Sequence, residues 1–227
     1  MKGKIMLAGG GGAEDSLLLD KKLASWIGRR GKMLFLPIAF QDPNRHKTSM
    51  AWITETFSPL GVENIQMWSN LAEHNSTELF EFDAVYIGGG NTYWLLAQIV
   101  ESSFDHHLVN FVRAGGIVYG GSAGAAILGR DIQTVKHLDR NDIDLTETRG
   151  LDLAAGYSVW VHYQEEDDQR IREYMNEKHH SVIAISERSG VVMDDTGIQS
   201  VGYKPAYYFL DSSRKCNDKS DKRGKLR

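Results

Sequence analysis

Short apolar runs alternate with longer amphipathic segments along the first half of the chain. The runs at Lys4–Ala8, residues 33–38 and Ala84–Ile87 are too short for helices and continuously apolar, which predicts buried strands. The segment at residues 16–29 carries apolar residues at helical spacing, and a glycine follows it. Strands that alternate with helices need crossover connections, which favour parallel strands covered by helices on both faces. We therefore predict an α/β fold with a three-layer, doubly wound and mainly parallel sheet.

The same reasoning predicts the remaining elements of the first half. Helices are expected at residues 46–59, residues 93–100, Phe104–Ala114 and Ala123–Leu128, and strands at residues 64–68 and 117–119. The second half differs, because residues 130–156 are polar with few periodic features and predict an excursion over the surface. Beyond it the pattern predicts a strand, a helix and four closely spaced short strands, at residues 158–162, 165–178, 182–185, 190–193, 199–202 and 206–210. Turn residues at 194–197 indicate a hairpin, so we expect antiparallel strands near the C-terminus.

The composition is that of an ordinary globular protein, with 41% hydrophobic and 25% charged residues among 227. A net charge of −4 offers no strong attraction for nucleic acid or anionic membranes, and no apolar run reaches the roughly 18 residues that span a bilayer. The N-terminus lacks the features of a signal peptide, and the single cysteine, Cys216, can form no internal disulfide. We expect a cytoplasmic protein that binds neither nucleic acid nor membrane, with a homodimer as an open hypothesis. Residues 1–211 are expected to form one domain, and residues 212–227 a disordered polar tail.

The turn between a predicted strand and a predicted helix contains Gly120-x-Ser122-x-Gly124. A serine on such a turn is held in a strained conformation clear of the sheet, and small neighbours let strand and helix approach closely. The amide of Ala123 lies at the start of the helix, where it can donate a hydrogen bond to an oxyanion. The alternative is a tight turn without chemistry, because glycine and serine are common in such turns. The strand before the turn and the helix after it favour Ser122 as a nucleophile.

A second glycine cluster, at residues 88–90, follows another predicted strand. Parallel strands collect ligands at their carboxyl ends, so both glycine turns should open on the same edge of the sheet. The amide of Gly90 could then supply a second oxyanion donor. The candidate substrate contacts in and after this cluster are Gly89, Asn91 and Thr92. A phosphate cradle or a simple loop is the alternative, but neither this cluster nor the glycines at residues 9–12 have the full spacing of a nucleotide-binding fingerprint.

A serine hydroxyl needs a general base, which is usually a histidine oriented by a carboxylate. His162 is the candidate base because it ends an apolar run, although a hydrogen-bonded structural role is the alternative. Glu187 is the preferred carboxylate because it also follows a predicted strand, whereas Asp194 and Asp195 come at the far end of the next strand. The order serine, histidine, acid differs from the order serine, acid, histidine of α/β-hydrolases, which argues against that fold.

Together these segments resemble peptidase family S51, the family of aspartyl dipeptidase (peptidase E) and cyanophycinase. The resemblance covers residues 4–210 and is most specific at residues 87–92 and 120–125. A histidine near the end of a later strand and a glutamate after the next strand match the family at residues 161–163 and 185–187. The resemblance implies a serine hydrolase on a fold similar to that of class I glutamine amidotransferases.

The resemblance also implies a role for each candidate residue. Ser122 would attack the scissile carbonyl, His162 would take its proton, and Glu187 would fix the imidazole tautomer. The amides of Gly90 and Ala123 would form the oxyanion hole, and water would hydrolyse the acyl-enzyme. The implied substrates are short peptides, either dipeptides with an N-terminal aspartate or an unusual isopeptide. No metal or organic cofactor is implied.

The chain departs from the dipeptidase pattern beside the reactive groups, with Gly121 in place of a tryptophan and Val161 in place of a proline. These changes bear on the substrate pocket. An acidic substrate needs a cationic partner, and nothing in the sequence selects one among Arg130, Lys136, Arg140 and Arg149. Two hypotheses of other classes are a glutaminase-like amidotransferase, which needs a cysteine at the turn, and a non-catalytic binding module that retains the fold.

Overall fold

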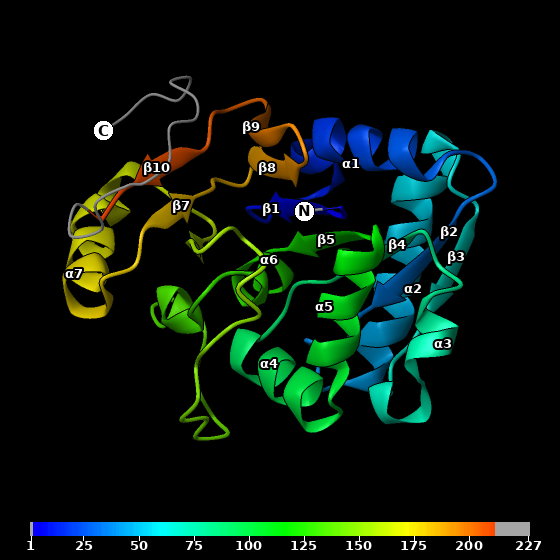
Figure 1. The fold of residues 1–227 in the computed structure, drawn as a ribbon, viewed down its shortest axis with the longest axis horizontal. Coiled ribbons are helices and arrows are strands. Elements are labelled where there is room, and N and C mark those ends of the chain that lie inside the picture. Colours follow the sequence, from blue (N-terminus) through cyan, green and yellow to red (C-terminus); the bar gives the residue numbers. More distant parts are fainter. Residues whose placement is uncertain (1, 212–227) are drawn as a thin grey trace.

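The computed structural model describes residues 2–211, and the polar tail expected at residues 212–227 lies outside the described residues. The main sheet consists of β1 (Lys4–Ala8), β2 (Lys32–Leu36), β3 (Asn64–Met67), β4 (Ala84–Ile87), β5 (Ile117–Gly121), β8 (Ser189–Asp194) and β9 (Gly197–Gly202). Its strand order is β3-β2-β4-β5-β1-β8-β9 (Figure 1). The first five strands in this order are parallel, whereas β8 pairs antiparallel with β1, and β9 with β8. The sheet is therefore mainly parallel, as predicted.

Helices cover both faces of the main sheet and so form the outer layers of the predicted three-layer arrangement (Figure 1). They are α1 (Ala13–Ile27) and α2 (Pro43–Phe57) on one face, and α3 (Ser76–Leu79), α4 (Thr92–Glu101), α5 (Phe104–Ala114) and α6 (Ala123–Leu128) on the other. Successive strand residues point to opposite faces, so Met6 lies in one core with Leu23 of α1. Leu7, the next residue of β1, lies in the other core with Leu96 of α4. This two-sided burial explains why the strands are apolar along their whole length.

A second, smaller sheet lies beside the main one, at the left of Figure 1. It contains β6 (Ser158–Trp160), β7 (Val182–Ala184) and β10 (Tyr207–Phe209) in the order β10-β7-β6, packed against α7 (Asp168–Lys178). Antiparallel strands near the C-terminus are confirmed for β8 and β9, but the expectation that the later strands extend one sheet is wrong for β6, β7 and β10. The reason lies in their side chains, because Trp160, Tyr174 and Phe209 form a separate aromatic core with α7.

The polar segment at residues 130–156 is only partly a surface excursion, which corrects the prediction. It contains a short 3-10 helix, η3 (Ile132–Val135), and three of its four residues are fully or almost fully buried against β6 and α6. A backbone bridge between Asp131 and Arg149 closes the segment into a loop. Ala154 is also fully buried, and Leu145, Leu151 and Leu153 pack against the same core. These buried residues are scattered among polar ones without helical or strand periodicity, so the sequence did not reveal their burial. We call residues 130–156 the wall segment.

Local capping explains where the first helices begin. The side chain of Asp15 accepts a hydrogen bond from the Gly12 amide, so α1 starts three residues before the predicted position. The side chain of Asp42 accepts from the Asn44 amide and starts α2 ahead of its prediction. The remaining short helices are η1 (Ser58–Leu60), η2 (Leu71–Glu73) and η4 (Glu165–Asp167). No helix within residues 2–211 combines the length and the apolar character that crossing a bilayer requires.

A buried carboxyl group joins α1 to the centre of the main sheet. Asp20 is 1% exposed and accepts hydrogen bonds from the hydroxyl groups of Ser16, at 2.7 Å, and Tyr119, at 2.8 Å. Tyr119 of β5 stacks on Tyr86 of β4 with ring centroids 4.4 Å apart. Burial raises the pKa of Asp20 to about 6, because loss of hydration outweighs the two hydrogen bonds that favour the charged form.

This carboxyl group should make stability depend on pH. The pKa of Asp20 is about 6 in the folded protein and 3.8 as its ordinary value, so folding favours the protonated form. Relative to Asp20→Asn, the wild type should lose on the order of 3 kcal/mol of unfolding free energy as the pH rises from about 4 to about 7. Urea denaturation of both proteins at several pH values measures the difference.

The matched control is Glu55→Gln, which changes an exposed carboxyl group on α2. Its unfolding free energy should follow that of the wild type across the same pH range. If the unfolding free energies of the wild type and Asp20→Asn change in parallel with pH, ionisation of Asp20 does not destabilise the fold.

Candidate active site

The carboxyl ends of β1 and β5 meet the end of β6 at the junction between the two sheets. The amide of His162, after β6, donates to the carbonyl oxygen of Gly9, after β1, at 2.8 Å. The amide of Ser122, after β5, donates to the carbonyl oxygen of Ala8 at 3.0 Å. Two successive residues at the end of β1 therefore hold the backbones of both the candidate nucleophile and the candidate base.

Ser122 stands on the predicted turn between β5 and α6 and has an unusual backbone conformation. Its φ is 50° and its ψ is −110°, a combination that a residue with a side chain rarely adopts. The turn is tight, because a Cβ atom at Gly120 would lie 2.4 Å from the carbonyl oxygen of Gly124. The conformation lifts the side chain of Ser122 out of the line of the strand and into a pocket.

His162 follows β6 with a positive φ of 52°, and its imidazole lies directly against Gly10. A Cβ atom on Gly10 would come within 2.1 Å of Cε1 of the ring, and Gly10 itself has a φ of 122°. Only glycine satisfies both conditions. Gly9 and Gly10 belong to the glycine run at residues 9–12, in which sequence reasoning found no functional role. Four consecutive glycines are visible in the sequence, but the contact between Gly10 and His162 can be recognised only in the folded structure.

The side chains of Ser122, His162 and Glu187 lie in a hydrogen-bonded row. Oγ of Ser122 is 2.8 Å from Nε2 of His162, and Nδ1 of His162 is 3.0 Å from Oε1 of Glu187. A carboxylate can only accept hydrogen bonds, so Nδ1 carries the proton in this arrangement. Nε2 is then free to accept the hydroxyl proton of Ser122. The geometry is that of a serine activated by an oriented base.

Glu187 lies in the segment that crosses from β7 of the small sheet to β8 of the main sheet. A tight turn at residues 186–189 shapes this segment, with the Ser189 amide donating to the Ser186 carbonyl at 3.0 Å. The side chain of Arg188 is 3.4 Å from Asp15 and lies over the ring of Tyr203, which ties the turn to its surroundings. The side chain of Glu187 is 55% exposed, so water screens its interaction with His162.

The two other candidate acids lie at the opposite end of the sheet. Gly190 of β8 pairs with Ala8 at the junction, whereas Asp194 pairs with Gly197 at the hairpin between β8 and β9. Asp195 is in the same hairpin. Among the three acids considered, Glu187 is therefore the one next to His162.

The glycine cluster after β4 lies against Ser122. A Cβ atom on Gly89 would be 3.3 Å from Cβ of Ser122, and Gly90 reaches its position with a φ of 144°. The amide of Gly90 makes no backbone hydrogen bond within the described part of the chain. The amide of Ala123 opens α6 and so has no partner inside that helix. Neither amide therefore has a backbone partner among the described residues.

The residues after the cluster connect α4 to the wall segment. The side chain of Asn91 accepts from the Trp94 amide at 2.9 Å and donates to the Arg140 carbonyl at 2.8 Å. The amide of Thr92 donates to Oδ2 of Asp139 at 2.8 Å. Thr92 and Gly90 line the pocket that contains Ser122, whereas the side chain of Asn91 is occupied in holding the wall segment.

The pocket at the junction has a volume of about 430 Å³. Its lining residues are Gly90, Thr92, Ser122, Val135, Leu138, Asp139, Val161 and His162. The wall segment provides three of them, so it forms one side of the pocket. None of the eight is a lysine or arginine. Of the basic residues considered for an acidic substrate, all four lie outside this lining: Arg130, Lys136, Arg140 and Arg149.

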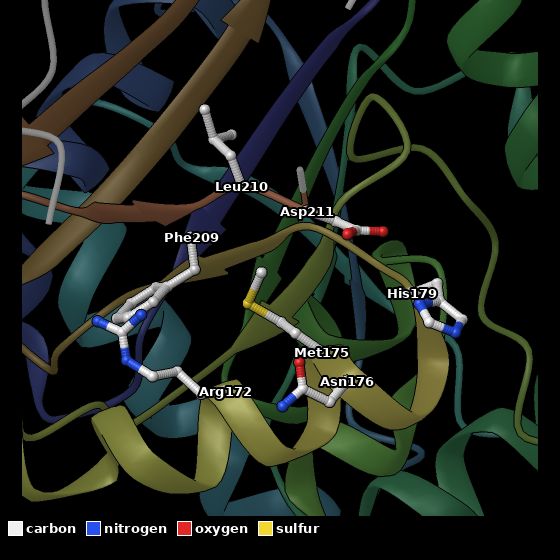
Figure 2. Close-up of a pocket in the computed structure, with 7 residues that line it drawn as sticks. All are labelled: Arg172, Met175, Asn176, His179, Phe209, Leu210 and Asp211. Atoms are coloured by element: carbon white, nitrogen blue, oxygen red, sulfur yellow. The ribbon is translucent and has the colours of Figure 1, made fainter. Parts of the chain in front are cut away.

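A smaller pocket of about 280 Å³ lies between α7 and β10, away from the junction (Figure 2). Its lining residues are Arg172, Met175, Asn176, His179, Phe209, Leu210 and Asp211. The guanidinium group of Arg172 lies over the ring of Phe209, 5.7 Å from its centre. No residue of the hydrogen-bonded row reaches this pocket. In the chain from residue 2 to residue 211, no three or more His, Cys, Asp or Glu side chains are grouped as metal ligands.

A family model describes most of this chain. The model of peptidase family S51 matches residues 5–201. Peptidase E of Streptomyces coelicolor is 26% identical over 168 residues, which cover 70% of this chain and 66% of that protein. Peptidase E of Shewanella sp. strain W3-18-1 is 32% identical over 143 residues, which cover 56% of this chain and 57% of that protein. The chain thus matches about two thirds or less of the length of these curated relatives.

Solved structures share the fold. The crystal structure of a peptidase from an acI-B1 Actinobacterium superposes with a TM-score of 0.73 and 18% sequence identity. The match covers 93% of this chain and 92% of that chain. At this identity the likeness concerns the fold alone, including the mainly parallel sheet with its helices.

Gly10 provides a test of how the imidazole is held. In Gly10→Ala the new methyl group would overlap the ring of His162, so the ring must move away from Ser122. A displacement of about 1 Å can lower reactivity roughly 100-fold, and we expect a loss of that size in the rate at which a fluorophosphonate labels Ser122. Mass spectrometry of the labelled peptide gives the rate.

The control variant is Gly12→Ala in the same glycine run. Gly12 has a φ of −95°, and a Cβ atom there would meet nothing within 4 Å. Labelling of this variant should match the wild type. Equal labelling of Gly10→Ala and Gly12→Ala would mean that Gly10 does not position His162.

Proposed function

The chain belongs to peptidase family S51, and from this premise we propose that it is a serine peptidase whose reactive groups are Ser122, His162 and Glu187. The observation that carries the proposal is the continuous row of hydrogen-bond distances, 2.8 Å from Oγ of Ser122 to Nε2 of His162 and 3.0 Å from Nδ1 of His162 to Glu187. A nucleophile needs a base within this reach, and the base needs an acceptor that fixes its tautomer. The strained backbone of Ser122 is typical of a nucleophile presented on a turn.

In the proposed acylation, Oγ of Ser122 attacks the carbonyl carbon of the scissile bond while Nε2 of His162 takes the hydroxyl proton. Glu187 accepts the hydrogen bond from Nδ1 and stabilises the positive imidazole. Collapse of the tetrahedral intermediate breaks the carbon–nitrogen bond, and His162 gives its proton to the departing amine. A water molecule then attacks the acyl-enzyme in the same way, which releases the acid and restores Ser122.

The amides of Gly90 and Ala123 are the proposed oxyanion donors. Neither amide has a backbone hydrogen-bond partner among residues 2–211, and the two residues flank Ser122 from the ends of two neighbouring strands, β4 and β5. Fixed backbone donors stabilise the developing negative charge without any reorganisation during the reaction. Glycine at position 90 also leaves the approach to its amide open, because no side chain is present there.

We propose short peptides as the substrates. A pocket of about 430 Å³ beside Ser122 accommodates a few residues, and the wall segment closes one side of it. The aspartate preference implied by the resemblance would need a cation near the nucleophile, and the eight lining residues include no lysine or arginine. We therefore propose short peptides without an aspartate preference. A cyanophycinase-like isopeptide is the alternative substrate, and a non-catalytic binding module is the alternative role.

The proposal also covers the relationship of the fold to other enzymes and the domain organisation. The mainly parallel sheet with nucleophile and glycine cluster at its carboxyl edge supports a likeness to class I glutamine amidotransferases. Ser122 stands where that chemistry uses a cysteine, which favours hydrolysis of peptides over glutaminase activity. A single peptidase domain that ends near residue 211 is the proposed organisation.

Substitution of the reactive groups tests the proposal on a panel of dipeptides and on a fluorophosphonate. Ser122→Ala and His162→Ala should each lower kcat/KM by about 10⁴-fold or more, and the double variant should be little worse, because residues that act as a unit are not additive. Glu187→Gln should lose only about 10- to 100-fold, because its half-exposed carboxylate is screened by water. Released amino acids are measured by chromatography.

His179→Ala is the matched control, since His179 shares the positive φ of His162 but lies at the end of α7. It should keep wild-type activity. A wild type that cleaves neither peptides nor isopeptides and is not labelled at Ser122 would support the binding module instead. Cleavage of isopeptides alone would identify the alternative substrate.

A further inference from the structure

Asp139 places a carboxylate in the pocket beside the nucleophile. It is half-buried in the wall segment and is one of the eight residues that line the pocket with Ser122 and His162. Its Oδ2 accepts a hydrogen bond from the Thr92 amide at 2.8 Å, at the start of α4. Among the hydrogen bonds and ion pairs of the described residues, none uses Oδ1 of Asp139. One oxygen therefore fixes the carboxylate, and the other has no partner within residues 2–211.

The charge of this carboxylate is not balanced within the pocket lining. The lining contains no lysine or arginine, and its one histidine, His162, directs Nδ1 to Glu187. Arg140 follows Asp139 in the chain but is exposed and outside the lining, and its carbonyl group is fixed by Asn91. A cationic group of a substrate would thus find an unpaired anion near the nucleophile, whereas a substrate carboxylate would be repelled.

The apolar residues of the lining favour an apolar side chain of the substrate. Val135 and Val161 are almost fully buried, and Leu138 is the exposed edge of the same surface. A side chain that enters between them would bury apolar area, at a gain of roughly 25 cal/mol per Å². A charged side chain would lose hydration there without finding a partner.

Covalent chemistry restricts which cation can use this site. In a peptide with a free N-terminus, the α-ammonium group and the first carbonyl carbon are attached to the same Cα atom. When Ser122 attacks that carbonyl, the ammonium group must lie in the same pocket. An ammonium–carboxylate hydrogen bond is charge-assisted and about twice as strong as a neutral one. A side-chain ammonium could also reach the pocket, but it would have to cross the apolar surface.

We propose that Asp139 binds the free α-ammonium group of the substrate and that Val135, Leu138 and Val161 receive an apolar side chain of its first residue. The inference rests on the proposed function, because it assigns the substrate class of the same site. It makes the protein an aminopeptidase or dipeptidase for peptides that begin with an apolar residue. Asp139 is then a specificity-determining residue, while the bond-breaking steps belong to Ser122 and His162.

A purely structural role for Asp139 makes a different prediction. If the carboxylate only holds the start of α4, then asparagine should replace it, since the amide oxygen can still accept from Thr92. Asp139→Asn keeps the shape and removes the charge. It would therefore leave the choice between charged and neutral N-termini unchanged if the role were structural, and would abolish that choice if Asp139 binds the ammonium group.

The test compares leucyl-p-nitroanilide, its N-acetylated form and aspartyl-p-nitroanilide. In the wild type, kcat/KM for the free amine should exceed that for the acetylated compound by about 10- to 100-fold, the usual worth of a hydrogen bond to a charged group. Leucine should be preferred to aspartate by a similar factor. In Asp139→Asn the ratio of free amine to acetylated compound should fall toward 1. The ratio of leucine to aspartate should fall but stay above 1, because the apolar lining is unchanged. Asp142→Asn, which changes an exposed acid of the same segment, should keep both wild-type ratios.

The results of these experiments distinguish failure of this inference from failure of the proposed function. If the wild type is labelled at Ser122 by a fluorophosphonate but cleaves the acetylated compound as fast as the free amine, this inference is wrong and the proposed function stands. The wild-type ratios decide this even if Asp139→Asn does not fold. Unchanged ratios in a folded Asp139→Asn also overturn the inference. If Ser122 is not labelled and Ser122→Ala is as active as the wild type, the proposed function fails and this inference fails with it.

Discussion

The hydrogen bond from the His162 amide to the Gly9 carbonyl, at 2.8 Å, joins the small sheet to the main sheet. The next contact along β1 is the bond from the Ser122 amide to the Ala8 carbonyl, at 3.0 Å. The reactive groups come from different sheets, so their separation depends on how the sheets are fastened together. The end of β1 does this with two successive carbonyl groups, and Gly10 then supplies the bare surface on which the imidazole lies.

Much of the fold could be predicted from the sequence because burial on both faces leaves a strong local pattern. The strands at Lys4–Ala8 and Ala84–Ile87 and the helices at Phe104–Ala114 and Ala123–Leu128 have the predicted bounds. The division into two sheets could not be predicted in this way, because β6 and β7 are apolar like the strands of the main sheet. What separates them is an aromatic core with α7, and such packing becomes visible only in three dimensions.

The site could be predicted in part for a related reason. Residues at strand ends are recognisable from sequence, which led to Ser122, His162 and Glu187, and the structure brings these three together. Contacts between distant glycines and side chains leave no periodic trace, so Gly10 was missed. At Gly121, where the chain departs from the dipeptidase pattern, a Cβ atom would lie 3.1 Å from the hydroxyl oxygen of Tyr86, so a larger residue requires the tyrosine to shift.

The wall segment is built differently from the rest of the site. Ser122 and His162 stand at strand ends, whereas Val135, Leu138 and Asp139 belong to the wall segment, which is connected to α4 through Asn91 and Thr92. Under the proposed function, changes at the exposed Leu138 and the half-buried Asp139 would alter what enters the pocket and leave Ser122 and His162 in place. Selectivity and chemistry would then lie in separate parts of the sequence, so new substrates could arise by divergence of a few residues of one loop.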